Sequence, residues 1–392
     1  MFRIFYAEKD ATLYESAESY NTGLDEILEI GKRLGTAGSN YLKSRAIIKF
    51  DLNEINAVLT KYSVNINDCK FILQLFTTHA KNLPSEYSID AKIVAQPWIN
   101  GTGFLSSTAT TQDGVSWAEP HASWSFSPYG GSNWISGSNV QINGSSLYAT
   151  GSGKGGSWLF QSGSGVFNAG FFNQVFFYQP GLQESEGFSY RPTDINMDVT
   201  EAILLWKSGS GGHVIANNGF LLKFSDADES NDNVTGYVRF FSRETHTIYV
   251  PRLTMYWDDS NFATGSLQPI NTESYVVYTN IKPTYKDTEI AKVRIYGREK
   301  YPKKSPTNLF PIQTINYLPT TTYYSISDAA TDEVIIPFDD IYTKISCDNT
   351  SNFIYLDMNG FMPERNYRLN LKIVDGIMEQ YINDQIYFKV VR

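Results

Sequence analysis

The chain has little cysteine and histidine, and this scarcity excludes several classes of site. Cys69 and Cys347 are the only cysteines, and they stand too far apart to suggest a disulfide framework or a cysteine-based zinc site. The four histidines are at positions 79, 121, 213 and 246, and none has the spacing of a zinc-binding helix motif. We expect two buried, reduced thiols and no resident cofactor.

An excess of positive charge and long apolar runs are also missing. The formal net charge is −9, and Lys303 with Lys304 forms only a short basic spot. This balance disfavours direct binding of nucleic acid through its phosphates. No run approaches the roughly 18 apolar residues of a membrane span, and charges at Arg3 and Glu8 interrupt the start where a signal peptide would be apolar. We expect a protein made in a cytoplasm and not exported by a standard signal.

Aromatic residues and turn formers are abundant. The 392 residues include 26 Tyr and 24 Phe, and the many Thr, Ser, Gly and Asn residues favour strands and turns over helices. A chain of this length exceeds one ordinary core. We predict an all-β protein, with a large jelly-roll-like β-sandwich over residues 1–262, a linker, and a smaller Ig-like β-sandwich over residues 275–392.

Three local patterns give sharper predictions. Residues 53–59 begin with a cap-like Asn and have apolar residues at helical spacing, which predicts a short helix. Residues 197–206 fit either a helical turn or a strand. Residues 367–373 alternate apolar and polar side chains, which predicts a half-buried antiparallel strand.

Residues 101–170 have the most unusual composition of the chain. This stretch holds 14 of the 29 glycines and four of the seven tryptophans, but only three charged residues. A flexible linker would be rich in Gly and Ser but not in Trp. We therefore expect short strands and packed loops, inserted into the first sandwich.

Aromatic rings in this stretch are candidates for ligand binding. Carbohydrate-binding surfaces combine flat rings with amide and hydroxyl groups. The candidate residues are Trp117, Trp124, Tyr129, Trp134 and Trp158. One alternative is that the tryptophans fill a core beneath the loops, and another is a subunit contact, since aromatic residues concentrate at interfaces.

An acidic segment at residues 225–233 is a candidate cation site. Asp226, Asp228 and Asp232 offer several carboxylate oxygens, which calcium prefers as ligands. The segment departs from an EF-hand loop, because Asn231 stands where the turn glycine belongs and no Glu closes the loop. The alternative is a solvated loop that joins the predicted strands 219–224 and 236–241 as a pair.

An ordered series of motifs resembles DNRLRE-type β-sandwich domains over about residues 8–257. The opening motifs are D-A-T-L-Y-E at 10–15, N-T-G at 21–23, I-L-E-I-G at 27–31 and S-R-A-I-I-K-F-D-L at 44–52. The closing motifs are M-D-V-T at 197–200, N-G-F-L-L at 218–222, F-S-R-E at 241–244 and P-R-L-T-M-Y at 251–256. The stretch 101–170 departs from the family, being longer and richer in Gly and Trp.

The motif residues also have plain structural interpretations. The N-T-G motif is typical of a turn. Arg45 and Asp51 flank a buried strand, and we expect them to pair with each other or with the closing strand. The F-S-R-E motif ends a strand with charges suited to a network at a buried edge.

The resemblance implies a jelly-roll-like sandwich similar to carbohydrate-binding modules, which usually sits in secreted or surface proteins. Without an export signal, such a fold is expected in the virion of a tailed bacteriophage of the T4-like, marine type. We expect a neck, tail or baseplate component, or a capsid decoration, that forms a homo-oligomer, docks onto other virion proteins and is not an enzyme. The alternative is a carbohydrate-binding adhesin module that holds a cell-surface glycan with the Trp-rich loops of 101–170.

Overall fold

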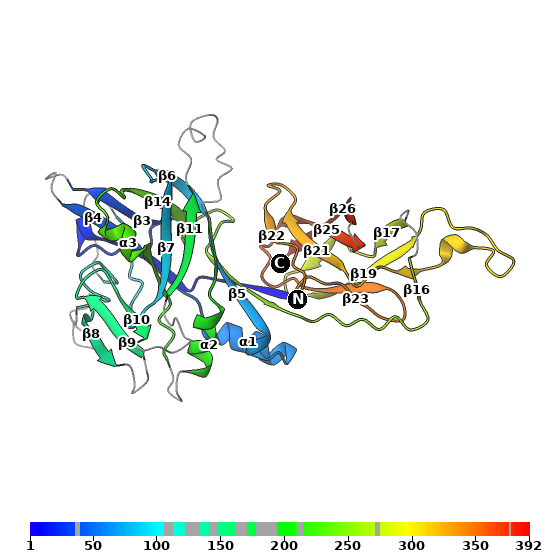
Figure 1. The fold of residues 1–392 in the computed structure, drawn as a ribbon, viewed down its shortest axis with the longest axis horizontal. Coiled ribbons are helices and arrows are strands. Elements are labelled where there is room, and N and C mark those ends of the chain that lie inside the picture. Colours follow the sequence, from blue (N-terminus) through cyan, green and yellow to red (C-terminus); the bar gives the residue numbers. More distant parts are fainter. Residues whose placement is uncertain are drawn as a thin grey trace. The chain divides into compact units, whose positions relative to one another are not determined.

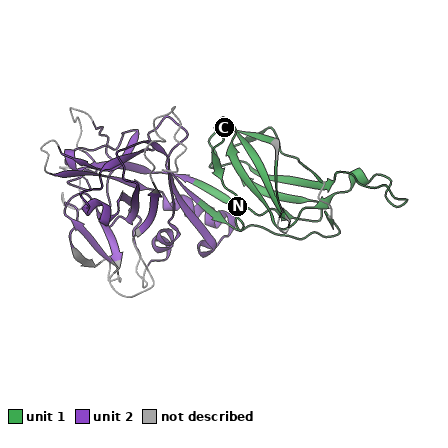
Figure 2. Ribbon diagram, turned by 45° about the horizontal axis from the view of Figure 1, so that its top comes forward, with its two compact units in different colours: residues 1–4, 255–392 green, residues 5–254 purple. Residues whose placement is uncertain are grey.

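The computed structural model describes residues 1–392 except 36–39, 106–112, 122–132, 142–146, 162–170, 178–193, 210–214, 271–274 and 376–377. The chain is mostly β, and several curled antiparallel sheets form a β-sandwich-like architecture (Figure 1). The predicted all-β class is therefore confirmed. Two compact units make up the chain (Figure 2): unit 1 contains residues 1–4 and 255–392, and unit 2 contains residues 5–254.

The largest sheet of unit 2 has the strand order β11-β7-β13-β4-β3-β14-β6, with β2 paired to β4. In chain order its strands are β2 (Lys9–Tyr14), β3 (Ile27–Leu34), β4 (Tyr41–Lys49), β6 (Thr77–Lys81), β7 (Glu86–Ile93), β11 (Phe171–Phe177), β13 (Phe220–Phe224) and β14 (Gly236–Phe241). β13 pairs with β4 and β7, whereas β14 pairs with β3 and β6. The expected pairing of β13 with β14 is wrong, because both strands find their partners among strands from the first hundred residues.

A second sheet follows the order β1-β15-β5-β12. Its strands are β1 (Phe2–Tyr6), β5 (Cys69–Leu75), β12 (Ile195–Asp198) and β15 (Arg252–Trp257). β12 and β5 are antiparallel. Unit 2 also has two short 3-10 turns: η1 (Glu15–Ala17) directly follows β2, and η2 (Ile66–Asp68) directly precedes β5.

Two helices lie near β5 (Figure 1). α1 (Leu52–Tyr62) begins after Asp51, whose carboxylate accepts a hydrogen bond from the N–H of Asn53 at 2.8 Å. α2 (Thr200–Ser208) follows β12 directly. The helix predicted at 53–59 is thus confirmed, and residues 197–206 contain a strand end as well as a helix. Across the described ranges, no helix has the length and apolar character needed to span a bilayer.

The Gly- and Trp-rich stretch forms a small sheet of its own. β8 (Ser136–Gln141), β9 (Leu147–Ser152) and β10 (Ser157–Gln161) are joined in the order β10-β9-β8, with antiparallel pairing. An isolated bridge also links Trp158 of β10 to Val94, just after β7. The short strands expected for this stretch are therefore present, and they belong to unit 2.

Unit 1 is built from two sheets. One has the order β16-β20-β19-β24-β23 with β17 paired to β19, and the other has the order β18-β26-β25-β21-β22. Their strands are β16 (Gln268–Pro269), β17 (Tyr275–Thr279), β18 (Thr284–Lys286), β19 (Ile290–Glu299), β20 (Asn316–Tyr317), β21 (Thr322–Asp328), β22 (Val334–Ile336), β23 (Ser346–Cys347), β24 (Asn352–Asp357), β25 (Arg365–Asp375) and β26 (Met378–Val391). Most pairs are antiparallel, while β16–β20 and β18–β26 run parallel.

The alternating pattern predicted for residues 367–373 is confirmed in β25. Tyr367, Leu369, Leu371 and Ile373 are buried, and the polar residues between them are half-buried. This arrangement has the period of two that places successive side chains on opposite faces of a sheet. The inward residues therefore supply part of the core of unit 1.

The division between the units differs from the predicted boundary at 262–275. Residues 258–270 contain β16 and belong to unit 1. The first four residues also belong to unit 1, because the amino group of Met1 donates to the carbonyl oxygens of Trp257 at 2.7 Å and Tyr342 at 3.1 Å. It also forms an ion pair with Asp259. A division of the sequence into consecutive segments cannot show that residues 1–4 belong to the same unit as residues 255–392.

Candidate functional site

Two tryptophans of the Gly-rich stretch, Trp117 and Trp134, pack into a core. Trp117 and Trp134 belong to one buried cluster with Trp98, Leu13 and residues of the largest sheet. Trp134 is 1% exposed, and its indole N–H donates to the carbonyl oxygen of Ser116 at 3.1 Å. The expectation that Trp117 and Trp134 present ring faces to a ligand does not hold, because other side chains cover both rings.

The other ring candidates have different outcomes. Trp158 is half-buried and packs against the same cluster. Trp124 and Tyr129 lie outside the described residues. The alternative that the tryptophans fill a core beneath the loops therefore applies to Trp117 and Trp134. Among the candidates that the structure describes, Trp158 is the one that stays partly exposed.

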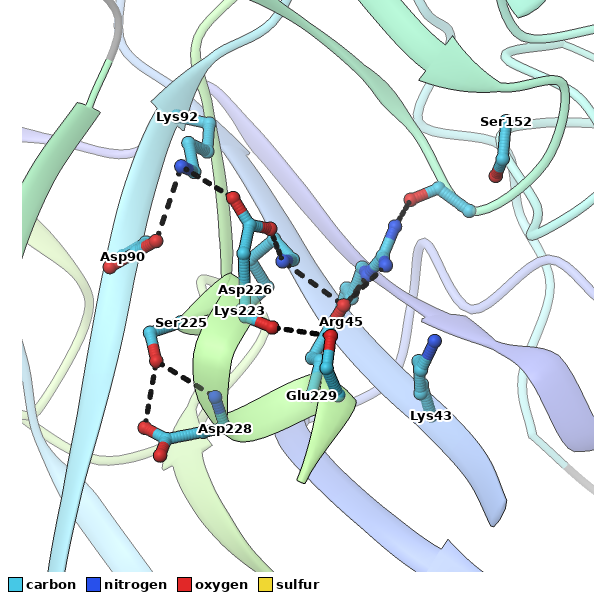
Figure 3. Close-up of polar contacts among 12 residues, drawn as sticks. Lys43, Arg45, Asp90, Lys92, Ser152, Lys223, Ser225, Asp226, Asp228 and Glu229 are labelled. Atoms are coloured by element: carbon cyan, nitrogen blue, oxygen red, sulfur yellow. Dashed lines mark hydrogen bonds and ion pairs between the residues drawn. The ribbon is translucent and has the colours of Figure 1, made fainter. Parts of the chain in front are cut away.

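A network of buried charges (Figure 3) adjoins this cluster, since the guanidinium of Arg45 lies 5.0 Å from the ring centroid of Trp117. Arg45 of β4 contacts Glu229 at two points, with Nε 2.9 Å from Oε1 and Nη2 2.7 Å from Oε2. Glu229 lies on α3 (Asp226–Ser230), and its Oε2 is also 3.0 Å from Nζ of the fully buried Lys223. Arg45 Nη1 donates to the carbonyl oxygen of Gly155 at 2.6 Å. Arg45 thus connects the largest sheet, α3 and the Gly-rich stretch.

The charges of this network indicate a structural role, and we call Arg45, Glu229 and Lys223 the clamp. Burial alone would raise the pKa of Glu229, but Arg45 and Lys223 hold it below its ordinary value. A buried carboxylate paired with two cations stays ionised and cannot donate a proton as the general acid of a glycosidase does. The expected pairing of Arg45 with Asp51 or the closing strand is wrong, since Asp51 caps α1 instead.

The three aspartates of the acidic segment have separate partners. Asp226 forms ion pairs with Lys223 and with Lys92 of β7, whose Nζ lies 3.4 Å from its Oδ2. Asp228 accepts a hydrogen bond from the N–H of Ser88 at 2.8 Å, and Asp232 is exposed. In the part of the chain that the structure describes, no group of three His, Cys, Asp or Glu side chains is placed to hold a metal. The three candidate carboxylates are therefore held by separate contacts and are not brought together, and α3 takes the place of the solvated hairpin loop given as the alternative.

The N-T-G motif holds the start of the Gly-rich stretch in place. Asn21 Nδ2 donates to the carbonyl oxygens of Asn100 at 2.7 Å and Val115 at 2.8 Å, and its Oδ1 accepts from the N–H of Gly103 at 2.8 Å. Gly101 has φ +77°, and a Cβ there would lie 2.3 Å from Asn21 Oδ1. The motif therefore specifies how the stretch attaches to the sandwich, which agrees with its interpretation as turn chemistry.

Asp10, in the first of the family-like motifs, is buried and titrates near neutral pH. Its Oδ2 accepts a hydrogen bond from the N–H of Arg243 at 2.7 Å, and its own N–H donates to Asn100 Oδ1 at 3.0 Å. Burial raises the pKa of Asp10 to about 7, and the contact with Arg243 opposes the rise. Because the carboxyl group is 1% exposed, a substrate cannot reach it. Its titration affects stability instead. The F-S-R-E motif meets Asp10 through the backbone N–H of Arg243, whereas its charged side chains, Arg243 and Glu244, pair with each other at 3.0 Å and are partly exposed.

The most exposed of the large apolar side chains gather on one connection of unit 1. We call residues 300–315, which join β19 to β20, the arm; it projects from the body of the unit in both ribbon views (Figures 1 and 2). Tyr301, Leu309, Phe310 and Ile312 are 74%, 63%, 70% and 62% exposed. A connection longer than about 15 residues with no strand or α-helix is uncommon and is usually either functional or disordered, and this one has the internal hydrogen bonds of an ordered segment. The arm is therefore the candidate binding element.

The arm has internal order that holds these side chains outward. Ser305 and Asn308 exchange two backbone hydrogen bonds of 3.1 Å, and Asn308 Nδ2 donates to Thr314 Oγ1 at 2.9 Å. Pro311 is buried and begins the 3-10 turn η3 (Pro311–Gln313). A segment that is ordered before binding loses less conformational entropy when it docks.

The sequence analysis did not predict that residues 300–315 form a binding element, although the sequence carries a signal of one. It identified only the basic pair Lys303 and Lys304. The segment also contains Pro302, Pro306 and Pro311 and lacks the alternation of a strand, which is typical of a loop. Large apolar residues within such a loop indicate a contact surface, but whether they are exposed cannot be predicted from the sequence alone.

Comparisons with known proteins leave the chain without an assigned family. No family model and no curated protein matches it. Among solved structures, it is similar at a TM-score of 0.16 and 8% identity to the adhesin domain of Epf from Streptococcus pyogenes, covering 100% of this chain and 91% of that one. It is similar at a TM-score of 0.16 and 7% identity to a beta-glucuronidase of Parabacteroides merdae, covering 97% of this chain and 36% of that one. Scores this low carry no argument about fold or function.

Proposed function

We propose that this chain is a non-enzymatic structural protein that docks onto other proteins, as a neck, tail or baseplate component or a capsid decoration of a phage virion does. The observation that carries the proposal is the arm, where Tyr301, Leu309, Phe310 and Ile312 are exposed together on an ordered segment. Aromatic and apolar anchors of this kind supply most of the binding energy of protein interfaces. An arm without a partner would be a solubility liability.

The carbohydrate-binding alternative has less support. Stacking on a sugar needs an accessible ring face, and Trp117 and Trp134 are buried. Trp158 is the described candidate that remains. Saturable binding of the folded chain to a glycan panel, lost in Trp158→Ala and retained in an arm variant, would favour this alternative.

Purified particles test the structural proposal. In particles isolated from cells that encode the chain, quantitative mass spectrometry is expected to find it at a fixed copy number that survives a high-salt wash. Replacing Leu309 and Phe310 by Asp is expected to reduce that copy number to background. The matched control is Ile290→Asp with Ile341→Asp, two exposed apolar residues of the same unit outside the arm. Absence of the wild-type chain from the particles would overturn the proposal.

A further inference from the structure

Unit 2 carries an exposed apolar pair in acidic surroundings. Phe104 and Leu105 are 51% and 45% exposed. The Leu105 N–H donates to Asp25 at 3.0 Å, and Asp113 accepts from the N–H and the hydroxyl of Thr102, each at 2.8 Å. These bonds place two carboxylates beside the pair, and Glu26 is exposed next to Asp25. We call Phe104, Leu105, Asp25, Glu26 and Asp113 the acidic patch.

The arm has the complementary chemistry. Its apolar side chains are accompanied by Lys300, Lys303 and Lys304, all exposed, and the sequence from 300 to 315 contains no Asp or Glu. This positive segment belongs to a chain whose formal net charge is −9. Opposite charges around apolar contacts guide association and set the register of an interface.

We propose that the arm of one chain docks onto the acidic patch of a second copy of the same chain. The inference rests on the proposed function, and it names the partner. Every copy carries both surfaces, so each chain offers one arm and one patch. Because the two surfaces differ, the contact is heterologous, and repetition of it produces a ring if the rotation closes or a filament if it does not.

A mixing experiment tests this arrangement. Phe310→Asp inactivates the arm and leaves the patch intact, whereas Phe104→Asp inactivates the patch and leaves the arm intact. Each variant alone is expected to be a monomer by analytical ultracentrifugation, with self-association weakened by roughly thirtyfold or more. An equimolar mixture retains one intact pair of surfaces and is expected to form a one-to-one dimer that does not grow further. A contact between two arms would not be rescued by mixing.

Charge reversal provides a second measurement. Lys303→Glu with Lys304→Glu is expected to weaken self-association of the wild-type chain by about a hundredfold at low salt. Lys61→Glu with Lys207→Glu, exposed on α1 and α2, makes the same change in net charge and is expected to leave the association constant unchanged.

Two outcomes would overturn the inference. One is a wild-type chain that stays monomeric at every concentration up to its solubility limit, and the other is a mixture of the two variants that stays monomeric while wild type assembles. Neither outcome touches the proposed function, because incorporation into particles that depends on Leu309 and Phe310 would still show docking onto a different virion protein. Circular dichroism and thermal unfolding are expected to show that each variant is folded, because the substitutions are at exposed positions.

Discussion

Two connections of this chain place their large aromatic side chains in opposite environments. In the Gly-rich stretch of unit 2, Trp134 is 1% exposed and Trp117 packs in the same cluster. In the arm of unit 1, Phe310 is 70% exposed. The difference lies in attachment: Asn21 and Arg45 bind the first connection to the sandwich, whereas the hydrogen bonds of the arm described above link the arm to itself.

This contrast shows that aromatic content does not decide whether a loop forms a core or an interface. A loop folds inward when buried polar groups of the scaffold satisfy its backbone, because its aromatic residues can then displace water without leaving carbonyl groups unpaired. A loop that satisfies its own backbone can stand away from the scaffold and present its apolar groups. The following predictions test this contrast.

The largest effect is expected at the buried tryptophan. Trp134→Ala removes a large side chain from the cluster and is expected to lower the free energy of unfolding by about 4 kcal/mol. Phe310→Ala, in the arm, is expected to change it by less than about 0.5 kcal/mol. Urea denaturation measures both. Similar losses in the two variants would remove the distinction between the connections.

The attachment of the Gly-rich stretch is tested at Arg45. Arg45→Met leaves Glu229 buried beside one cation instead of two and removes the hydrogen bond to Gly155. We expect a loss of about 3 kcal/mol in stability. The double variant Arg45→Met with Glu229→Leu removes both charges and is expected to recover part of the loss. A neutral single variant would mean that the clamp does not stabilise the fold.

Asp10 makes the stability of unit 2 depend on pH. Its pKa in the folded state is about 7, above the ordinary aspartate value of 3.8, so the folded chain binds the proton more tightly than the unfolded chain. This contribution is fully present below about pH 4 and is lost as the pH rises through about 7, with a slope of up to about 1.4 kcal/mol per pH unit. Thermal or urea unfolding of wild type and Asp10→Asn across this range measures the difference. Curves that run parallel would contradict the assignment.

The smallest effect on stability is expected from the lysines of the arm. Lys303→Ala with Lys304→Ala is expected to change the free energy of unfolding by less than about 0.5 kcal/mol, because both side chains are exposed. Self-association, in contrast, is expected to become less sensitive to salt. A loss of stability comparable to that of Trp134→Ala would show that the arm is part of a core.

Much of the secondary structure could be predicted from short-range patterns. The cap and apolar spacing of α1 and the alternation of β25 depend on residues a few positions apart, so they survive any change in topology. The pairing of strands was harder to predict. β13 and β14 follow each other in sequence, yet each pairs with strands from the N-terminal region. The partner of Arg45 was missed for the same reason, since Glu229 is remote in sequence.

The sequence by itself determined the β class, the scarcity of groups for metal or thiol chemistry, and the location of an unusual Gly- and Trp-rich stretch. Only the tertiary structure decided that Trp117 and Trp134 are buried, that Asp226 binds lysines, and that Phe310 faces outward. The physical reason is that local geometry follows from neighbouring residues, whereas burial and ionisation depend on which distant segment arrives to cover a side chain or compensate its charge.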